Sequence, residues 1–120
     1  MKIEKNTGFK RVIYAAGYSY QGLKHNLLNE AAFRQEFILA LVLIPVASIV
    51  SVTNIERIFL IFSLVLILIV ELLNTAIEAT VDRIGLEHHP LSGLAKDSGS
   101  AAVLISLFLF IYIWIAILFF

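Results

Sequence analysis

The chain has 120 residues, of which 60% are hydrophobic and 15% are charged, and its nine basic and nine acidic side chains cancel. Soluble domains carry roughly 45–50% apolar and about 25% charged residues, so this composition excludes an ordinary soluble protein and indicates an integral membrane protein. The absence of cysteine excludes disulfides, thiolate catalysis and cysteine-based metal sites. The balanced charge gives no reason to expect a nucleic acid partner.

Residues 1–28 form the first predicted element. Apolar side chains recur there at steps of three and four residues, as on one face of a helix, at Phe9, Val12, Ile13, Ala16, Tyr20, Leu23 and Leu27. The basic side chains in this segment are Lys2, Lys5, Lys10, Arg11 and Lys24. We expect an amphipathic helix lying on an anionic membrane surface. A solubilising cytosolic arm is the alternative.

Three apolar segments follow, and they predict transmembrane helices over residues 31–52, 58–81 and 98–120. The strictly apolar part of the first segment is short, so this helix must include the polar turn 31–36. Pro45 within it is tolerable because neighbouring helices can satisfy the freed backbone groups. Residues 53–57 are expected to form a tight turn. Residues 82–99 are expected to form a loop with turn residues at Gly85, Pro90 and Gly93.

The basic residues predict the orientation in the membrane. Six of the nine Lys and Arg residues precede the apolar part of the first span, which begins at Phe37. The positive-inside rule then places the N-terminus and the 82–99 loop in the cytoplasm, and the 53–57 turn and the C-terminus outside. The expected fold class is an all-α, multi-pass membrane protein.

The second span carries an unexpected polar stripe. Positions spaced by three, four and seven share one face of a helix, and this spacing joins Glu71, Asn74, Thr75, Glu78 and Asp82. A carboxylate inside hydrocarbon costs on the order of 2.5–3.5 kcal/mol, so two of them require a functional reason. Glu71 lies about 10 Å deeper along the helix axis than Glu78.

The predicted topology brings further polar residues to the same cytoplasmic boundary, namely Glu30, Glu36, Lys96 and Asp97. Carboxylate and amide oxygens suit Mg²⁺, which proteins usually bind through one or two carboxylates together with substrate phosphates. A boundary carboxylate for the metal and a deeper one for a lipid proton indicate a membrane kinase. Since three spans are few to enclose such a site, we expect a homo-oligomer.

Several of these residues also have a simpler explanation when taken alone. Glu30 could pair with Arg34 across one helical turn. Asp97 could complement a helix dipole. His88 and His89 suggest a metal site only if further ligands converge, and otherwise are solvated loop residues.

Four blocks of the sequence resemble the signature of the prokaryotic diacylglycerol kinase family: NEAAFRQE at 29–36, ELLNTAIEA at 71–79, DRIG at 82–85 and AKDSGSAAV at 95–103. The likeness extends from Thr7 to Trp114. It implies a small homotrimeric kinase of the bacterial inner membrane, with three spans per subunit and an N-terminal surface helix. It also implies that MgATP and diacylglycerol are the substrates, and that the enzyme works among membrane lipids with Mg²⁺ as cofactor.

The resemblance implies a role for individual residues as well. Glu71 is implied as the general base, Asn74 as its essential neighbour, and Glu30 and Glu78 as carboxylates that hold Mg²⁺ on ATP. The implied nucleotide contacts are Arg11, Tyr18, Glu87, His88, His89, Lys96 and Asp97. The implied lipid-substrate contacts, besides Glu71, are Glu36, Ser100 and Trp114. These roles replace the simpler explanations of Glu30 and Asp97.

Other functions remain open at this point. A sister branch of the family, similar in ELLNTAIE, phosphorylates undecaprenol. The 29–36 block and the segment 98–100 favour the diacylglycerol branch, whereas His88 and Pro90 are less typical of it. A small proton-coupled transporter is an alternative of a different class, but it would carry a mid-span carboxylate without a polar cluster at one face. A structural subunit of a larger complex would leave the intramembrane carboxylates unexplained.

Overall fold

The computed structural model describes residues 7–120, which form four helices joined by short connections. The helices are α1 (Gly8–Asn29), α2 (Ala31–Ile49), α3 (Asn54–Ile84) and α4 (Pro90–Phe119). By length and composition, α2, α3 and α4 are each apolar enough to cross a membrane. The prediction of an all-helical chain with three candidate spans is therefore confirmed. Lys2 and Lys5, assigned above to the basic part of the first helix, lie outside the described residues.

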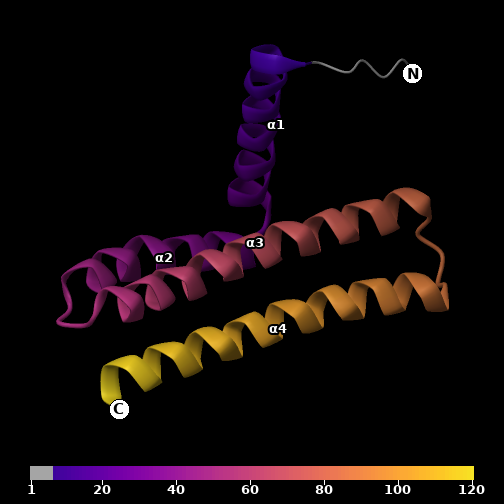
Figure 1. Cartoon of the computed structure of the whole chain (residues 1–120). Helices are drawn as coiled ribbons and strands as arrows, with labels where there is room; N and C mark the ends of the chain where they lie inside the picture. The colour runs from indigo at the N-terminus through magenta and orange to yellow at the C-terminus, as the bar shows by residue number, and fades with distance from the viewer. Residues whose placement is uncertain (1–6) are drawn as a thin grey trace.

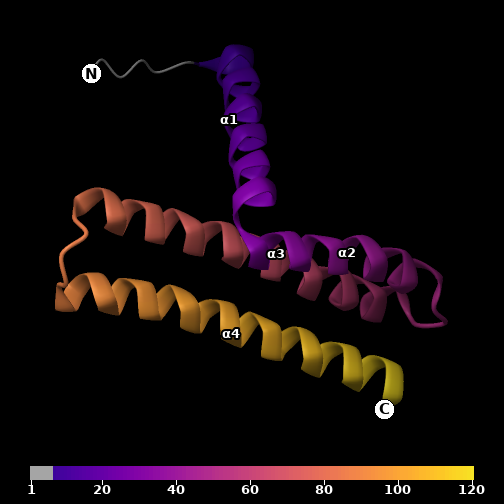
Figure 2. The same ribbon diagram turned by 180° about the vertical axis from the view of Figure 1, so that it is seen from behind.

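The central helix is α3. Within residues 7–120 it packs closely against α1, α2 and α4, whereas the backbones of α2 and α4 do not come close to each other. Figures 1 and 2 show α2 and α4 running along α3, with α1 standing crosswise to all three. The spans thus form an open layer, and large apolar side chains such as Ile38, Phe62 and Phe108 face outwards. This outer surface is available to lipid or to a second copy of the chain.

The connection between α2 and α3 is held by polar groups at the helix ends. The Thr53 hydroxyl accepts a hydrogen bond from the Glu56 N–H (3.2 Å), and the Glu56 carboxylate accepts one from the Thr53 N–H (2.9 Å), which is a capping box. Arg57 donates to the carbonyl oxygens of Ala47 and Val52, next to the end of α2. The segment expected as a tight turn is therefore mostly the first turn of α3.

The connection between α3 and α4 is shorter than the sequence suggested. It comprises residues 85–89, so the prediction of a loop over 82–99 was wrong. Pro90 occupies the first position of α4, where its missing N–H leaves no hydrogen bond unmade. Nδ1 of His89 accepts a hydrogen bond from the Leu91 N–H (3.1 Å) and caps the helix. Pro90 thus starts a helix.

The packed core lies between α2 and the halves of α3 and α4 that are next to the α2–α3 connection. Its buried members are Ala40, Ala47, Leu60, Leu64 and Trp114. The indole N–H of Trp114 donates to the Leu60 carbonyl oxygen (3.2 Å) and to Oγ of Ser63 (3.1 Å). Because the indole N–H is hydrogen-bonded inside the layer, this end of the layer is packed with side chains. The polar residues singled out above lie toward the opposite end.

Candidate active site

Three residues of the polar stripe lie along one face of α3. Glu71 is buried, with 6% of its surface exposed. Nδ2 of Asn74 donates a hydrogen bond to Oε1 of Glu78 over 3.1 Å, and both residues are partly buried. Asn74 therefore orients the Glu78 carboxylate, while Glu71 lies about one turn further into the layer.

The amide oxygen of Asn74 points toward α4. This Oδ1 atom is buried and has no hydrogen-bond donor within the described chain. It lies against Gly99, where a Cβ atom would overlap it. A buried acceptor without a donor costs about 1–3 kcal/mol, so a group supplied by a ligand would stabilise this arrangement.

The oxygen atoms of Asn74 and Glu78 are the ligand types that Mg²⁺ prefers. Residues 7–120 contain no group of three His, Asp or Glu side chains that could hold a metal ion by themselves. Mg²⁺, however, is usually held by one or two carboxylates and completed by waters and substrate phosphates. The partly buried Glu78 carboxylate, which the Asn74 amide orients, therefore fits a magnesium ion that arrives with a nucleotide.

A second carboxyl group lies beside Glu71. Glu36, on the second turn of α2, is close enough to interact directly with the Glu71 carboxyl group. Oε2 of Glu36 is buried and has no hydrogen-bond partner in the described chain. The structure thus brings a residue implied to contact the lipid next to the residue implied to be the base.

Lys96 of α4 lies opposite the outer end of the stripe. Its Nζ atom is 2.7 Å from Oδ1 of Asp82, and this is the single ion pair among the described residues. Glu78 is also close enough to attract the ammonium group. Both partners of the pair are about half exposed, and exposed ion pairs contribute about 0–1 kcal/mol. A polyphosphate could therefore replace Asp82 as the partner of Lys96 at low cost.

Loop residues and Lys96 line one pocket at the α3–α4 junction. Its volume is 210 Å³, and its polar lining residues are Asp82, Glu87, His88, His89, Ser92 and Lys96. Four of the seven nucleotide contacts implied by the resemblance are therefore brought together. Ligand sites usually measure roughly 300–1,000 Å³, so this pocket alone is small for a nucleotide. Sequence reasoning placed Asp82 in the stripe but missed it as the partner of Lys96.

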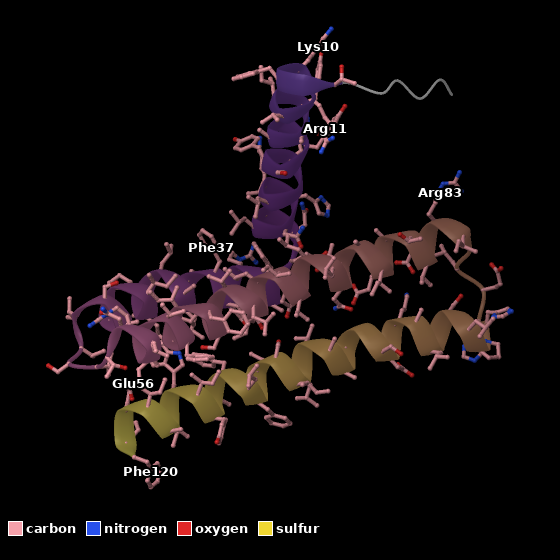
Figure 3. The ribbon with its side chains drawn as sticks, in the orientation of Figure 1. Lys10, Arg11, Phe37, Glu56, Arg83 and Phe120 are labelled. Atoms are coloured by element: carbon pink, nitrogen blue, oxygen red, sulfur yellow. The ribbon has the colours of Figure 1, made fainter. Side chains whose placement is uncertain are left out.

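Two of the implied nucleotide contacts lie away from this pocket. Arg11 and Tyr18 are exposed on α1. Figure 3 shows Arg11 near the free end of α1, far from Arg83, which marks the end of α3 beside the pocket. Asp97 is exposed on α4, one residue beyond Lys96. Arg11 and Tyr18 therefore do not line this pocket.

The remaining predicted site residues are distributed along the layer. Glu30 is the N-cap residue between α1 and α2 and is half-buried. Ser100 is exposed on α4, next to Gly99. Trp114 lies in the core, where it contacts Leu60, about 16 Å along α3 from Glu71.

The helix ends around Glu30 differ from the sequence interpretation. Arg34, the expected partner of Glu30, instead donates to the carbonyl oxygens of Leu27 (3.0 Å) and Leu28 (3.3 Å), in the last turn of α1. These carbonyls lack helical partners, and a cation there also complements the helix dipole. The Glu30 carboxylate therefore does not form an ion pair with Arg34.

A contact that sequence reasoning missed attaches α1 to α3. Asn26 is buried at 5% exposure, its Nδ2 donates to the Gly22 carbonyl oxygen (2.9 Å), and its Oδ1 accepts a hydrogen bond from the Thr75 hydroxyl (2.8 Å). The signal was present in the sequence, since Asn26 is a polar residue at an apolar-face position, three residues after Leu23. The contact sets the end of α1 at the height of the stripe.

Comparisons with known proteins agree with these observations. A family model described as prokaryotic diacylglycerol kinase matches residues 17–118. A diacylglycerol kinase of Escherichia coli K12 is 54% identical over 112 residues, which cover 93% of this chain and 92% of the relative. For a diacylglycerol kinase of Pseudomonas aeruginosa the identity is 53% over 112 residues, covering 93% and 91%. For one of Haemophilus influenzae it is 50% over 116 residues, covering 97% and 98%.

Proposed function

The chain belongs to the prokaryotic diacylglycerol kinase family and is a lipid kinase. From this membership we propose that it transfers the γ-phosphate of ATP to the primary hydroxyl of diacylglycerol, forming phosphatidic acid. The reaction takes place at the cytoplasmic face of the bacterial inner membrane. The observation that carries this assignment to individual residues is the pairing of a buried Glu71, beside Glu36, with an outer Glu78 held by Asn74.

The position of α1 supports a membrane boundary between the two carboxylates of α3. The Asn26–Thr75 hydrogen bond attaches α1, which stands crosswise to the spans, at the height of Thr75 (Figure 1). From Asn54 to Thr75, α3 is about 33 Å long, close to the roughly 30 Å of hydrocarbon in a bilayer. If α1 lies on the cytoplasmic surface, Glu71 lies about 6 Å inside that level and Glu78 about 4.5 Å outside it.

This placement assigns a task to each side chain. Glu71 accepts the proton of the lipid hydroxyl while the hydroxyl oxygen attacks the γ-phosphorus of ATP. The bond between that phosphorus and the β,γ-bridging oxygen breaks and ADP leaves. Glu36 lies beside Glu71 to hold the glycerol group. Lys96 exchanges Asp82 for the phosphates of the nucleotide. Glu30 and Glu78 would hold Mg²⁺, which neutralises charge on the transferred phosphoryl group. Phosphoryl transfer needs mainly such positioning and charge stabilisation.

A homotrimer with shared sites completes the proposal. Three observations support it: the open layer of spans, the small pocket of one subunit, and the exposure of Arg11 and Tyr18 on α1, away from that pocket. In the trimer, α1 of one subunit would bring Arg11 and Tyr18 to the pocket of its neighbour. The N-terminus is then cytoplasmic, as the distribution of basic residues predicts.

A competition between lipid substrates tests the proposed function. The purified protein in lipid bilayers should transfer labelled phosphate from MgATP to diacylglycerol, and an excess of undecaprenol should slow this transfer only weakly. Preferential labelling of undecaprenol would assign the chain to the other substrate branch. The absence of lipid-dependent ATP consumption with either substrate would contradict the kinase chemistry itself.

A further inference from the structure

At Gly99 the backbone of α4 packs directly against the polar stripe of α3. The residue is buried, and a Cβ atom built on it would overlap Oδ1 of Asn74, lie 3.3 Å from Cγ of Asn74 and 3.6 Å from Cδ1 of Ile77. Among the residues that the structure describes, Gly99 is the only one of the six glycines that is limited in this way by a residue of another helix. The space beside Gly99 is therefore filled by the Asn74 amide group.

The Asn74 amide group is held on two sides. On one side its Nδ2 donates to Oε1 of Glu78 (3.1 Å). On the other side its buried Oδ1 rests against the backbone of α4 at Gly99. The amide plane, and through it the direction of the Glu78 carboxylate, thus depends on the absence of a side chain at position 99.

We propose that Gly99 is a positioning residue for the phosphoryl transfer, which keeps the Asn74 amide in the orientation that directs Glu78 toward the metal–nucleotide complex. The inference rests on the proposed role of Glu78 in holding Mg²⁺. A methyl group at position 99 meets chiefly the free end of a side chain and not the backbone of α3. Asn74 therefore rotates away from Glu78, while the packing of α3 against α4 is largely kept.

The first test separates the site from the fold with Gly99→Ala and a matched control, Gly17→Ala. Both changes replace a helical glycine by a better helix former, but nothing lies within 4 Å of a Cβ atom at position 17. Binding of a non-hydrolysable ATP analogue is measured against Mn²⁺ concentration, without lipid substrate, together with the thermal midpoint in detergent micelles. Because loss of a residue that orients a metal ligand costs about 10–100-fold in metal affinity, we expect the Mn²⁺ dependence of Gly99→Ala to shift at least about tenfold.

The expected result also includes an unchanged thermal midpoint for Gly99→Ala and wild-type behaviour of Gly17→Ala. A wild-type Mn²⁺ dependence of Gly99→Ala would overturn the inference about Gly99 and leave the proposed function intact. If nucleotide binding by the wild type does not depend on Mn²⁺, the result would instead overturn the metal-binding role of Glu78 on which the inference rests.

A second variant identifies Asn74 as the residue through which Gly99 acts. In an Asn74→Ala background the side chain that meets the new methyl group is absent, so adding Gly99→Ala should cause no further shift in Mn²⁺ dependence. An additional tenfold shift there would overturn the inference. If Gly99→Ala alone fails to fold, the double variant should fold, because the obstruction has been removed. Failure of both to fold would show that another contact occupies the space, and would also overturn it.

Discussion

Removing the Thr75 hydroxyl tests how the N-terminal helix is held at the active site. In Thr75→Val, Oδ1 of Asn26 loses its donor in a position with 5% exposure, while Nδ2 of Asn26 keeps its bond to the Gly22 carbonyl oxygen. An orphaned buried acceptor costs about 1–3 kcal/mol, and hydrogen bonds between membrane helices average about 0.6 kcal/mol. We therefore expect the free energy of unfolding to fall by about 1–2 kcal/mol.

The same change should raise the KM for ATP, because α1 carries the proposed nucleotide contacts Arg11 and Tyr18. Unfolding of the purified protein in mixed micelles, followed by circular dichroism, measures the stability, and steady-state phosphorylation of diacylglycerol measures the KM. With all lipid concentrations held fixed, we expect a larger effect on the KM for ATP than on kcat.

Thr80→Val is the matched control on the same helix. The Thr80 hydroxyl is exposed and donates only within α3, to the Ala76 carbonyl oxygen (2.7 Å), so this change should alter stability by no more than about 0.5 kcal/mol. Replacing both partners, as Asn26→Leu with Thr75→Val, should restore part of the loss, because no acceptor is then left unpaired. Equal effects of Thr75→Val and Thr80→Val would refute the reasoning.

Three further changes probe separate parts of the structure. Glu30→Gln should raise the Mg²⁺ concentration required for half-maximal activity by about tenfold. An unchanged Mg²⁺ titration would mean that Glu30 only connects α1 and α2 and does not bind the metal. Trp114→Phe should lower the free energy of unfolding by about 1 kcal/mol, because the indole hydrogen bonds to Leu60 and Ser63 are lost. A raised KM for diacylglycerol at unchanged stability would instead support a lipid contact. Thr53→Ala, measured in the same unfolding experiment, should cost about 1 kcal/mol through loss of the capping box, and no loss would mean that Arg57 alone holds the start of α3.

The three candidate spans could be predicted because long apolar runs have few alternatives to a helix in a membrane. The ends of α3 and α4 could not, since beyond the apolar runs local signals are ambiguous. Pro90 suits a turn and the first position of a helix equally well, and only the packing of α4 along α3 decides between them. Thr53 and Glu56 show the opposite case, because their capping-box spacing was readable from the sequence.

The part of the candidate site that lies on one helix could be predicted from the helical spacing of its residues. The stripe from Glu71 to Glu78 follows from periodicity, and the predicted topology added Glu36 and Lys96, which α2 and α4 bring beside it. The contact between Asn26 and Thr75 depends on how α1 meets α3, and the fit of Gly99 against Asn74 depends on how closely α4 approaches. Neither distance is encoded in a local pattern, so both required the three-dimensional structure.

The Glu71→Gln variant tests most directly whether the buried carboxylate is the general base. Glutamine keeps the size of the side chain but cannot accept the hydroxyl proton, so turnover of diacylglycerol should fall by about 10²–10⁴-fold. Binding of MgATP, measured without lipid, should remain within about twofold of the wild type, because Glu71 lies about 10 Å along α3 from Glu78. Loss of MgATP binding would make Glu71 a metal ligand, and retained turnover would contradict its role as the base.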